Sequence, residues 1–158
     1  MRIPMNASKG VVYIVEDDAS FRKSMERLIR GWKYEVVVFE SANSFLAHTN
    51  VRYPGCLLLD VRLPDIDGLH LHQALIEKGN KLPVVFMSAH GTIPMSVQAM
   101  KRGAIDFLPK PFNPEDLYSA ITNAMERNIH DLKEDFEKKE VLALIDKLTP
   151  RERRSCAG

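Results

Sequence analysis

Five short apolar segments recur along the chain, each separated from the next by an amphipathic segment. The apolar segments are rich in branched side chains and do not alternate with polar residues, which predicts β-strands covered on both faces. They occupy residues 11–15, 35–39, 56–60, 83–87 and, more weakly, 104–108. The segments that follow them place apolar residues at helical spacing. Helices are therefore expected at residues 20–31, 41–48, 67–77, 94–102 and 114–129.

This alternation predicts an α/β fold built on a doubly wound parallel sheet. Parallel strands joined by right-handed helical crossovers are the economical arrangement for five successive β-α units. The functional crevice of such a sheet lies beyond the carboxyl ends of its strands. With the strand order 2-1-3-4-5, strands 1, 3 and 4 would be neighbours there. We assign this domain to residues 11–128, preceded by an N-terminal extension of residues 1–10.

The composition changes after residue 128. Residues 131–140 are almost all charged, with opposite charges four positions apart, a spacing that supports a helix. Apolar residues continue through this segment near a 3.5-residue repeat with gaps. We therefore expect one long helix, whose residues 129–147 form a linker. This linker could pair as a coiled coil or be a solvated helix that pairs with nothing, and the pattern leaves both open.

Length and composition narrow the function classes. A chain of 158 residues with a 45% apolar fraction suits one domain with an appendage. The formal net charge of +1 gives no electrostatic case for nucleic-acid binding by the chain as a whole. No apolar stretch approaches the roughly 20 residues that span a bilayer, and the N-terminus lacks a signal-peptide pattern, so a cytoplasmic location without membrane partners is expected. Cys56 falls in an apolar strand, which favours a buried thiol over a metal ligand.

Polar residues stand at the ends of four predicted strands. They are Glu16 and Asp17 after strand 1, Asp60 at the end of strand 3, Ser88 after strand 4 and Lys110 after strand 5. Clustered carboxylates repel one another unless a cation neutralises them, and an all-oxygen donor set suits Mg²⁺, with Mn²⁺ as a substitute. A lysine and a hydroxyl could hold the oxygens of an anion, and an aspartate can itself form an acyl phosphate. The set predicts a site for phosphoryl transfer.

Other polar residues near these strand ends receive structural interpretations. Asp18 is expected to cap the helix at residues 20–31. Asp65 and Asp67 are expected to shape the loop after strand 3, with Asp67 as a turn or cap residue. His70 and His72 are treated as surface residues and His90 as a loop residue near the site entrance.

Four motifs in order resemble the receiver domain of two-component response regulators. They are VVYIVEDD, LLLDVRLPDIDG, VVFMSAHG and GAIDFLPKPF, within a match from about Val11 to Arg127. The stretch SAHGTIPMSVQAMKRGAIDFLPKPF resembles the FixJ-type subgroup, and LTPRER resembles the opening of a LuxR-type helix-turn-helix domain whose recognition helix is absent here. The resemblance implies a flavodoxin-like (βα)5 fold with strand order 2-1-3-4-5, and an incomplete DNA-binding domain at residues 148–158.

The resemblance also implies roles around the acidic cluster. Asp60 would accept a phosphoryl group from a sensor histidine kinase. Asp17 would bind Mg²⁺ directly, and Glu16 would bind it directly or through water. The backbone carbonyl of Arg62 would complete the protein ligands. Glu16 stands where many receivers have aspartate, so the geometry of the metal site can differ.

Further roles concern the other strand ends. Lys110 would pair with the carboxylate or phosphoryl oxygens, and Ser88 would hydrogen-bond the phosphoryl group. Phe107 occupies the switch aromatic position, where its ring would turn inward as Ser88 moves. Since Phe107 lacks the hydroxyl of a tyrosine, any switch would act by packing alone. Pro111 follows the lysine where the family tends to have a cis peptide bond.

The function implied is a phosphorylation-dependent switch that is not an enzyme beyond its own aspartyl phosphorylation and dephosphorylation. It would control dimerisation, through the face formed by the fourth helix, fifth strand and fifth helix or through the linker helix. It would bind DNA only through the missing C-terminal domain and so regulate transcription. The alternative is a stand-alone receiver that acts through protein contacts only.

Two other classes fit the motifs poorly. A phosphatase of the haloacid-dehalogenase type needs a second acid two residues after the nucleophile, and here that position is Arg62. A calcium loop of the EF-hand type needs alternating ligands and a terminal glutamate, which DVRLPDIDG lacks.

Overall fold

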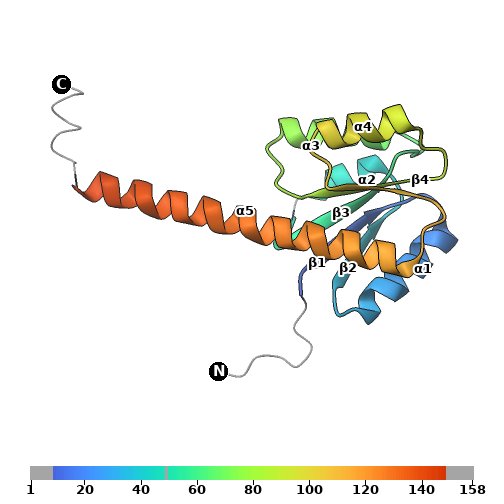
Figure 1. Ribbon diagram of the computed structural model, residues 1–158, viewed down its shortest axis with the longest axis horizontal. Helices are drawn as coiled ribbons and strands as arrows, with labels where there is room; N and C mark the ends of the chain where they lie inside the picture. Colours follow the sequence, from blue (N-terminus) through green and yellow to red (C-terminus); the bar gives the residue numbers. More distant parts are fainter. Residues whose placement is uncertain (1–8, 49, 149–158) are drawn as a thin grey trace. The chain divides into compact units, whose positions relative to one another are not determined.

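The computed structural model describes residues 9–48 and 50–148. Five parallel strands form one sheet in the order β2-β1-β3-β4-β5, as predicted (Figure 1). The strands are β1 (Val11–Val15), β2 (Glu35–Phe39), β3 (Gly55–Asp60), β4 (Val84–Ser88) and β5 (Asp106–Pro109). The helices are α1 (Ala19–Gly31), α2 (Ala42–Ala47), α3 (Gly68–Glu77), α4 (Ile93–Lys101) and α5 (Pro114–Leu148).

Helices cover both faces of the sheet, which explains why its strands show no polar alternation. Val12 and Ile14 of β1 point into a core shared with α1 and the first turns of α5. Val11, Tyr13 and Val15 point into a second core shared with α2, α3 and α4. Since successive residues of a strand face opposite ways, each central strand must be apolar at nearly every position.

Acidic side chains begin two of the helices as expected. Asp18 caps α1 by accepting the backbone N–H of Phe21, and Asp67 caps α3 by accepting that of His70. Asp65 has a further role, because its two carboxylate oxygens accept the backbone N–H groups of Ala42 at 3.1 Å and of Asn43 at 2.7 Å. The loop after β3 is thereby fastened to the start of α2.

Two expectations from the sequence were wrong in detail. β5 begins at Asp106, two residues later than predicted, because the N–H of Ala104 still closes the last turn of α4 on the carbonyl of Ala99 at 3.1 Å. His72 is buried, not on the surface, and its ring packs edge-on against Phe86 with 5.3 Å between centroids. The buried face of α3 consists of Gly68, Leu71, His72 and Leu75, so His72 takes a core position beside the apolar residues.

The thiol of Cys56 lies in the core, as predicted, and burial raises its pKa to about 12. The thiol therefore remains protonated and behaves as a small apolar group. Among the residues that the structure describes, no helix combines the length and the apolar character needed to cross a bilayer. The segment predicted to open a DNA-binding domain lies, apart from Leu148, outside the described residues, as do residues 1–8 of the predicted extension.

The helix α5 is continuous through Leu148, as the sequence predicted, and the contacts of the chain divide between Asn128 and Ile129. Asn128 is fully buried at this boundary. Its Oδ1 accepts the backbone N–H of Gly55 at 2.8 Å, and its Nδ2 donates to the carbonyl of Lys81 at 3.3 Å. One amide thus satisfies two backbone groups from the start of β3 and the loop before β4.

Replacing Asn128 tests this anchor. Asn128→Ala leaves two backbone groups without their partner, so we expect the free energy of unfolding to fall by about 1–3 kcal/mol. Urea denaturation followed by circular dichroism measures the change. Asn123→Ala, at an exposed position of the same helix, is the matched control and should be close to neutral. Equal midpoints for the two variants would contradict the assignment.

Candidate functional site

Four strand ends converge at the carboxyl edge of the sheet. Glu16 follows β1, Asp60 ends β3, Ser88 ends β4 and Lys110 follows β5. The register pairs Val15 with Leu59, which brings the next residues, Glu16 and Asp60, side by side. The backbone N–H of Lys110 donates to the carbonyl of Ser88 at 2.8 Å, joining the ends of β4 and β5. The topology therefore gathers residues that are far apart in the chain.

The ammonium group of Lys110 sits between two carboxylates. Its Nζ lies 2.5 Å from Oε1 of Glu16 and 3.1 Å from Oδ2 of Asp60. The side chains of Glu16 and Asp60 are only 1% and 8% exposed, so solvent screens these contacts weakly. The same ammonium lies 4.4 Å from the ring centroid of Phe21, a cation–π contact contributed by α1.

Hydrogen bonds hold both buried carboxylates in place. Oδ1 of Asp60 accepts the backbone N–H of Arg62 at 3.1 Å, which leaves Oδ2 to the lysine. Oε2 of Glu16 accepts the backbone N–H of Asp18 at 3.1 Å. The guanidinium of Arg22 donates to the backbone carbonyl of Glu16 at 2.7 Å. The predicted role of the Arg62 carbonyl as a metal ligand stays a prediction.

The acidic cluster carries more negative charge than its lysine can balance. Glu16, Asp17 and Asp60 each offer an oxygen, and these oxygens all lie within 4.8 Å of one another. Burial, with a further contribution from Asp60, raises the pKa of Glu16 to about 7, although Lys110 acts to lower it. Three carboxylates face one ammonium group, so a divalent cation would relieve their repulsion. Asp17 is exposed and leaves the cluster open on one side.

These residues fit Mg²⁺ by donor type and charge. All three donors are carboxylate oxygens, the ligands that a hard cation prefers. Desolvation acts to lower the pKa of Lys110, but Glu16 and Asp60 outweigh it, so the pKa is raised and the lysine remains a cation. The site thus provides a buried aspartate, a fixed positive charge and an acidic pocket for a metal ion.

The remaining predicted residues lie at the β4 and β5 ends of the site. Ser88 is buried, and its Oγ accepts the backbone N–H of His90 at 3.1 Å. Phe107 is half-buried, with its ring centroid 6.2 Å from that of Phe86. The peptide bond between Lys110 and Pro111 is cis, as expected. Ser88 and Phe107 are therefore associated with the loop between β4 and α4, while Lys110 lies among the acids.

The sequence analysis did not single out Gly68, the residue after the predicted turn or cap residue Asp67. A Cβ at this position would lie 2.4 Å from the carbonyl oxygen of Asp60 and 3.0 Å from Cα of Val61. The N–H of Gly68 also donates to the carbonyl of Val61 at 2.7 Å. The loop from β3 therefore folds back tightly against the backbone of Asp60. The dipeptide Asp67-Gly68 signals a turn, but this close approach is visible only in three dimensions.

Residues 12–122 match the family described as the response regulator receiver domain. The chain belongs to this family. As a receiver domain it is 39% identical over 150 residues to the response regulator protein TmoT of Ectopseudomonas mendocina, covering 95% of this chain and 68% of that protein. It is 34% identical over 151 residues to the transcriptional regulatory protein FixJ of Bradyrhizobium diazoefficiens, covering 96% and 74%. The chain spans about two thirds of the length of several such relatives.

Solved structures of other receivers agree. The response regulator StyR superposes with a TM-score of 0.83 at 39% identity, covering 90% of this chain and 72% of that one. FixJ-N superposes with a TM-score of 0.68 at 38% identity, covering 73% and 93%. This receiver domain of a two-component response regulator is therefore of the FixJ type, as its motifs indicated, with the flavodoxin-like arrangement expected for the sheet.

A methyl group at Gly68 should disturb the phosphoacceptor position. Because the added Cβ meets backbone, not a flexible side chain, Gly68→Ala is expected to lower the free energy of unfolding by about 1–3 kcal/mol. It should also shift the backbone amide resonances of Asp60 and Arg62. Gly31→Ala is the control, since nothing lies within 4 Å of its Cβ position. Unchanged stability and unchanged Asp60 resonances would show that the loop is not constrained in this way.

Proposed function

We propose that the domain is a phosphorylation-dependent switch in which Asp60 accepts a phosphoryl group from a sensor histidine kinase. The observation that carries the proposal is the contact of one half-buried lysine, Lys110, with both Asp60 and Glu16. This contact fixes the carboxylate of Asp60, the proposed nucleophile, at the end of β3. Glu16 and Asp17 lie beside it and carry negative charge that Lys110 alone does not balance. Membership of the receiver family supports this role. The activity consists only of the protein's own phosphorylation and dephosphorylation.

The transfer follows from the chemistry of the groups present. A carboxylate oxygen of Asp60 attacks the phosphorus of a phosphohistidine on the kinase. The P–O bond forms as the P–N bond breaks, and the electron pair of that bond leaves with the imidazole, giving an acyl phosphate. Lys110 offsets charge on the transferring oxygens. Mg²⁺ bound by Glu16, Asp17, Asp60 and the carbonyl of Arg62 would supply further positive charge there, and Mn²⁺ could replace it.

The loop after β4 would change its position when Asp60 is phosphorylated. The hydroxyl of Ser88 can donate to a phosphoryl oxygen on Asp60, drawing its loop toward the site. The ring of Phe107, which lacks a hydroxyl, then responds by packing alone. The result is a shift of population toward a second arrangement of α4 and β5.

We propose that the protein lies in the cytoplasm and that its switch regulates transcription. Relatives such as FixJ carry names that describe regulation of transcription, and they are longer than this chain. We propose receiver residues 11–128, a helical linker at residues 129–147 and a LuxR-type DNA-binding domain that opens at residues 148–158. DNA contact belongs to that domain. A stand-alone receiver that acts through protein contacts is the alternative.

The phosphoacceptor can be tested with beryllofluoride, a phosphoryl mimic, in the presence of Mg²⁺. We expect amide resonances of the β4–α4 loop to shift in the wild-type protein and to stay unchanged in Asp60→Asn. Asp67→Asn is the matched control, because it makes the same carboxylate-to-amide change at an exposed position where asparagine also caps a helix. A response that persists in Asp60→Asn would exclude Asp60 as the acceptor.

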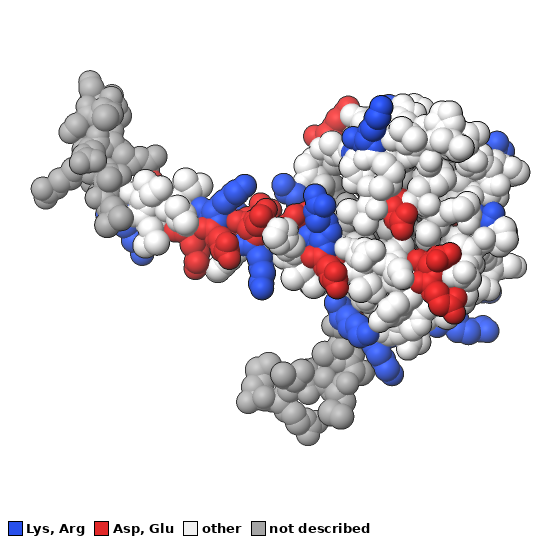
Figure 2. Space-filling model, in the orientation of Figure 1, with Lys and Arg blue, Asp and Glu red and all other residues white. Residues whose placement is uncertain are grey.

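Two surfaces support homodimer formation. On α4, Ile93, Val97 and Met100 are 80%, 46% and 45% exposed. The residues of α5 beyond Asn128 expose further large apolar side chains, among them Phe136, Val141, Leu142 and Leu144. Figure 2 shows a stretch of mixed charge along the helix that leaves the receiver, followed by an uncharged surface toward the end of the described helix.

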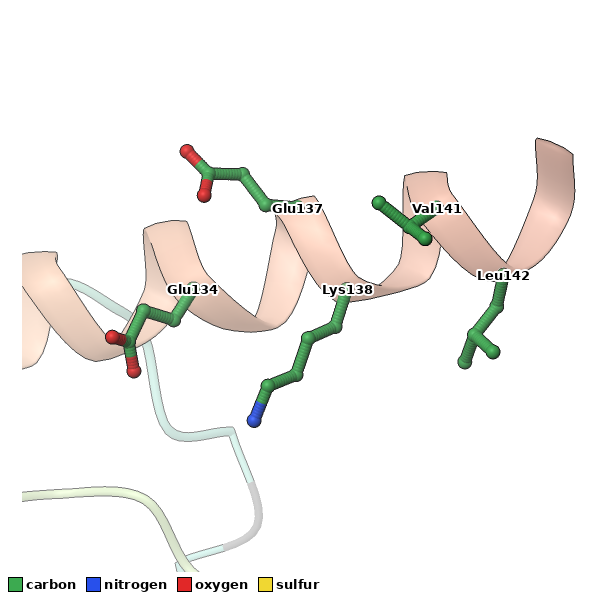
Figure 3. A pocket seen from close by; sticks show the side chains of 5 residues that line it. All are labelled: Glu134, Glu137, Lys138, Val141 and Leu142. Atoms are coloured by element: carbon green, nitrogen blue, oxygen red, sulfur yellow. The ribbon is translucent and has the colours of Figure 1, made fainter. Parts of the chain in front are cut away.

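The linker surface is that of a single helix. One shallow surface on it is lined by Glu134, Glu137, Lys138, Val141 and Leu142. Figure 3 shows Lys138 and Leu142 extending to one side of α5 and Glu137 and Val141 to the other. Each side of the helix therefore carries one charged and one apolar side chain of this set. Such a mixture is expected of a surface that pairs weakly with another helix. We assign phosphorylation-dependent pairing to the α4 face, which directly follows the Ser88 loop, and basal pairing to the linker.

Charged substitutions separate the two surfaces. Val97→Glu is expected to abolish the increase in molecular mass that beryllofluoride induces, because it buries a charge in the α4 contact. Leu142→Glu should weaken association with and without beryllofluoride. Sedimentation velocity at several protein concentrations measures both effects. If the mass of the wild-type protein does not respond to beryllofluoride, this receiver does not signal through dimerisation.

A further inference from the structure

The loop between β4 and α4 touches the ring of Phe107 at a single glycine. A Cβ built on Gly91 would lie 2.7 Å from Cε1 and 2.9 Å from Cζ of Phe107, closer than real side chains approach. The same Cβ would lie 3.5 Å from Cβ of Ser88, an ordinary contact. Of these neighbours, only the Phe107 ring lies too close to Gly91 to leave room for a Cβ atom.

The backbone at Gly91 does not itself require glycine. The glycines with left-handed φ angles in the described residues are Gly10, Gly79 and Gly103, and Gly91 is not among them. Gly91 is also exposed to solvent, so burial of its backbone does not explain the missing side chain. The close approach of Phe107 is the remaining structural reason for a glycine here.

The ring of Phe107 is backed by packed aromatic groups. Phe86 is fully buried next to it, with 6.2 Å between centroids, and His72 packs edge-on against Phe86 at 5.3 Å. The ring of Phe107 therefore has Phe86 on one side and the position beside Gly91 on another. A group added at Gly91 must therefore displace the ring or the loop.

The loop connects this contact to the site. Ser88 holds the backbone N–H of His90 through its hydroxyl, at 3.1 Å, so the turn from Ser88 to His90 is closed by a hydrogen bond. Gly91 follows directly. A displacement of Ser88 toward Asp60 would carry Gly91 with it and change the contact with Phe107.

We propose that Gly91 is a positioning residue of the switch, because its lack of a side chain admits the Phe107 ring against the β4–α4 loop. This inference rests on the proposed function of Asp60. A methyl group at residue 91 disfavours the arrangement in which ring and loop touch. In the proposed switch, Ser88 moves toward Asp60 and takes the loop away from its present contact with the ring, so Gly91→Ala is expected to bring the domain closer to its switched state.

The first measurement concerns the contact itself and needs no phosphoryl mimic. In the wild-type protein, nuclear Overhauser effects should connect the Hα atoms of Gly91 with the ring protons of Phe107. In Gly91→Ala the ring resonances should shift and the corresponding effects should weaken. Gly31→Ala, whose Cβ position is empty to 4 Å and whose φ is not left-handed, should leave them unchanged.

The second measurement is a beryllofluoride titration with Mg²⁺, followed by amide resonances of the loop. Gly91→Ala is expected to show an apparent affinity higher by about tenfold, the size of population shift that one overpacked methyl group typically produces. Gly31→Ala should titrate like the wild type. Phe107→Leu lacks Cε1 and Cζ, so in that background Gly91→Ala should change the affinity little, as a double-mutant cycle requires.

The outcomes separate the two proposals. If the wild-type protein does not respond to beryllofluoride, the proposed function fails, whatever Gly91→Ala does. If the wild type responds but Gly91→Ala titrates identically or more weakly, the role of Gly91 is overturned. A gain that persists in full in the Phe107→Leu background also overturns it, since the effect would then bypass the ring. If Gly91→Ala folds poorly, the nuclear Overhauser effects between Gly91 and Phe107 in the wild-type protein are the test. Their presence supports the proposed contact, and their absence overturns it.

Discussion

One ammonium group contacts two buried carboxylates at the carboxyl edge of the sheet. The site therefore holds more negative than positive charge, and its other features depend on this imbalance. Lys110 reaches Glu16 and Asp60 at once, and its position over the ring of Phe21 restricts where it can move. Because the pair of acids is nearly inaccessible to water, the unbalanced charge cannot be screened by solvent. Burial, with a further contribution from Asp60, raises the pKa of Glu16, and the exposed Asp17 lies on the side from which a cation can approach the two acids.

That arrangement depends on a sheet buried on both faces. The two cores fix the strands, so register places the residues just beyond them, and hydrogen bonds then orient the carboxylates of Glu16 and Asp60. Loops then complete the site by close approach. Gly68 lets the β3–α3 loop fold back on Asp60, and Gly91 lets the β4–α4 loop lie against Phe107. At both glycines, a side chain would meet a neighbouring group of the site closer than 3 Å.

Much of this could be predicted from the sequence, and the exceptions have a common cause. Asp60, Glu16 and Lys110 were identifiable because each stands where an unmistakable apolar strand stops, and strand ends in a parallel sheet must meet. The start of β5 was misplaced because the closing turn of α4 competes for the backbone of Ala104. The burial of His72 and the contacts of Gly68 and Gly91 depend on how one element lies against another. A linear pattern carries no such information.

The buried amide of Asn128 has a consequence for how receivers of this kind can be joined to different outputs. It satisfies two backbone groups of the receiver, and the contacts of the chain divide directly after it. A helix that is fixed at one residue keeps its phase from there on. Each residue inserted or deleted after Asn128 would rotate all later side chains by about 100° around the helix axis. The number of residues after Asn128 therefore sets which side of the helix each later side chain occupies, relative to the receiver end of the helix.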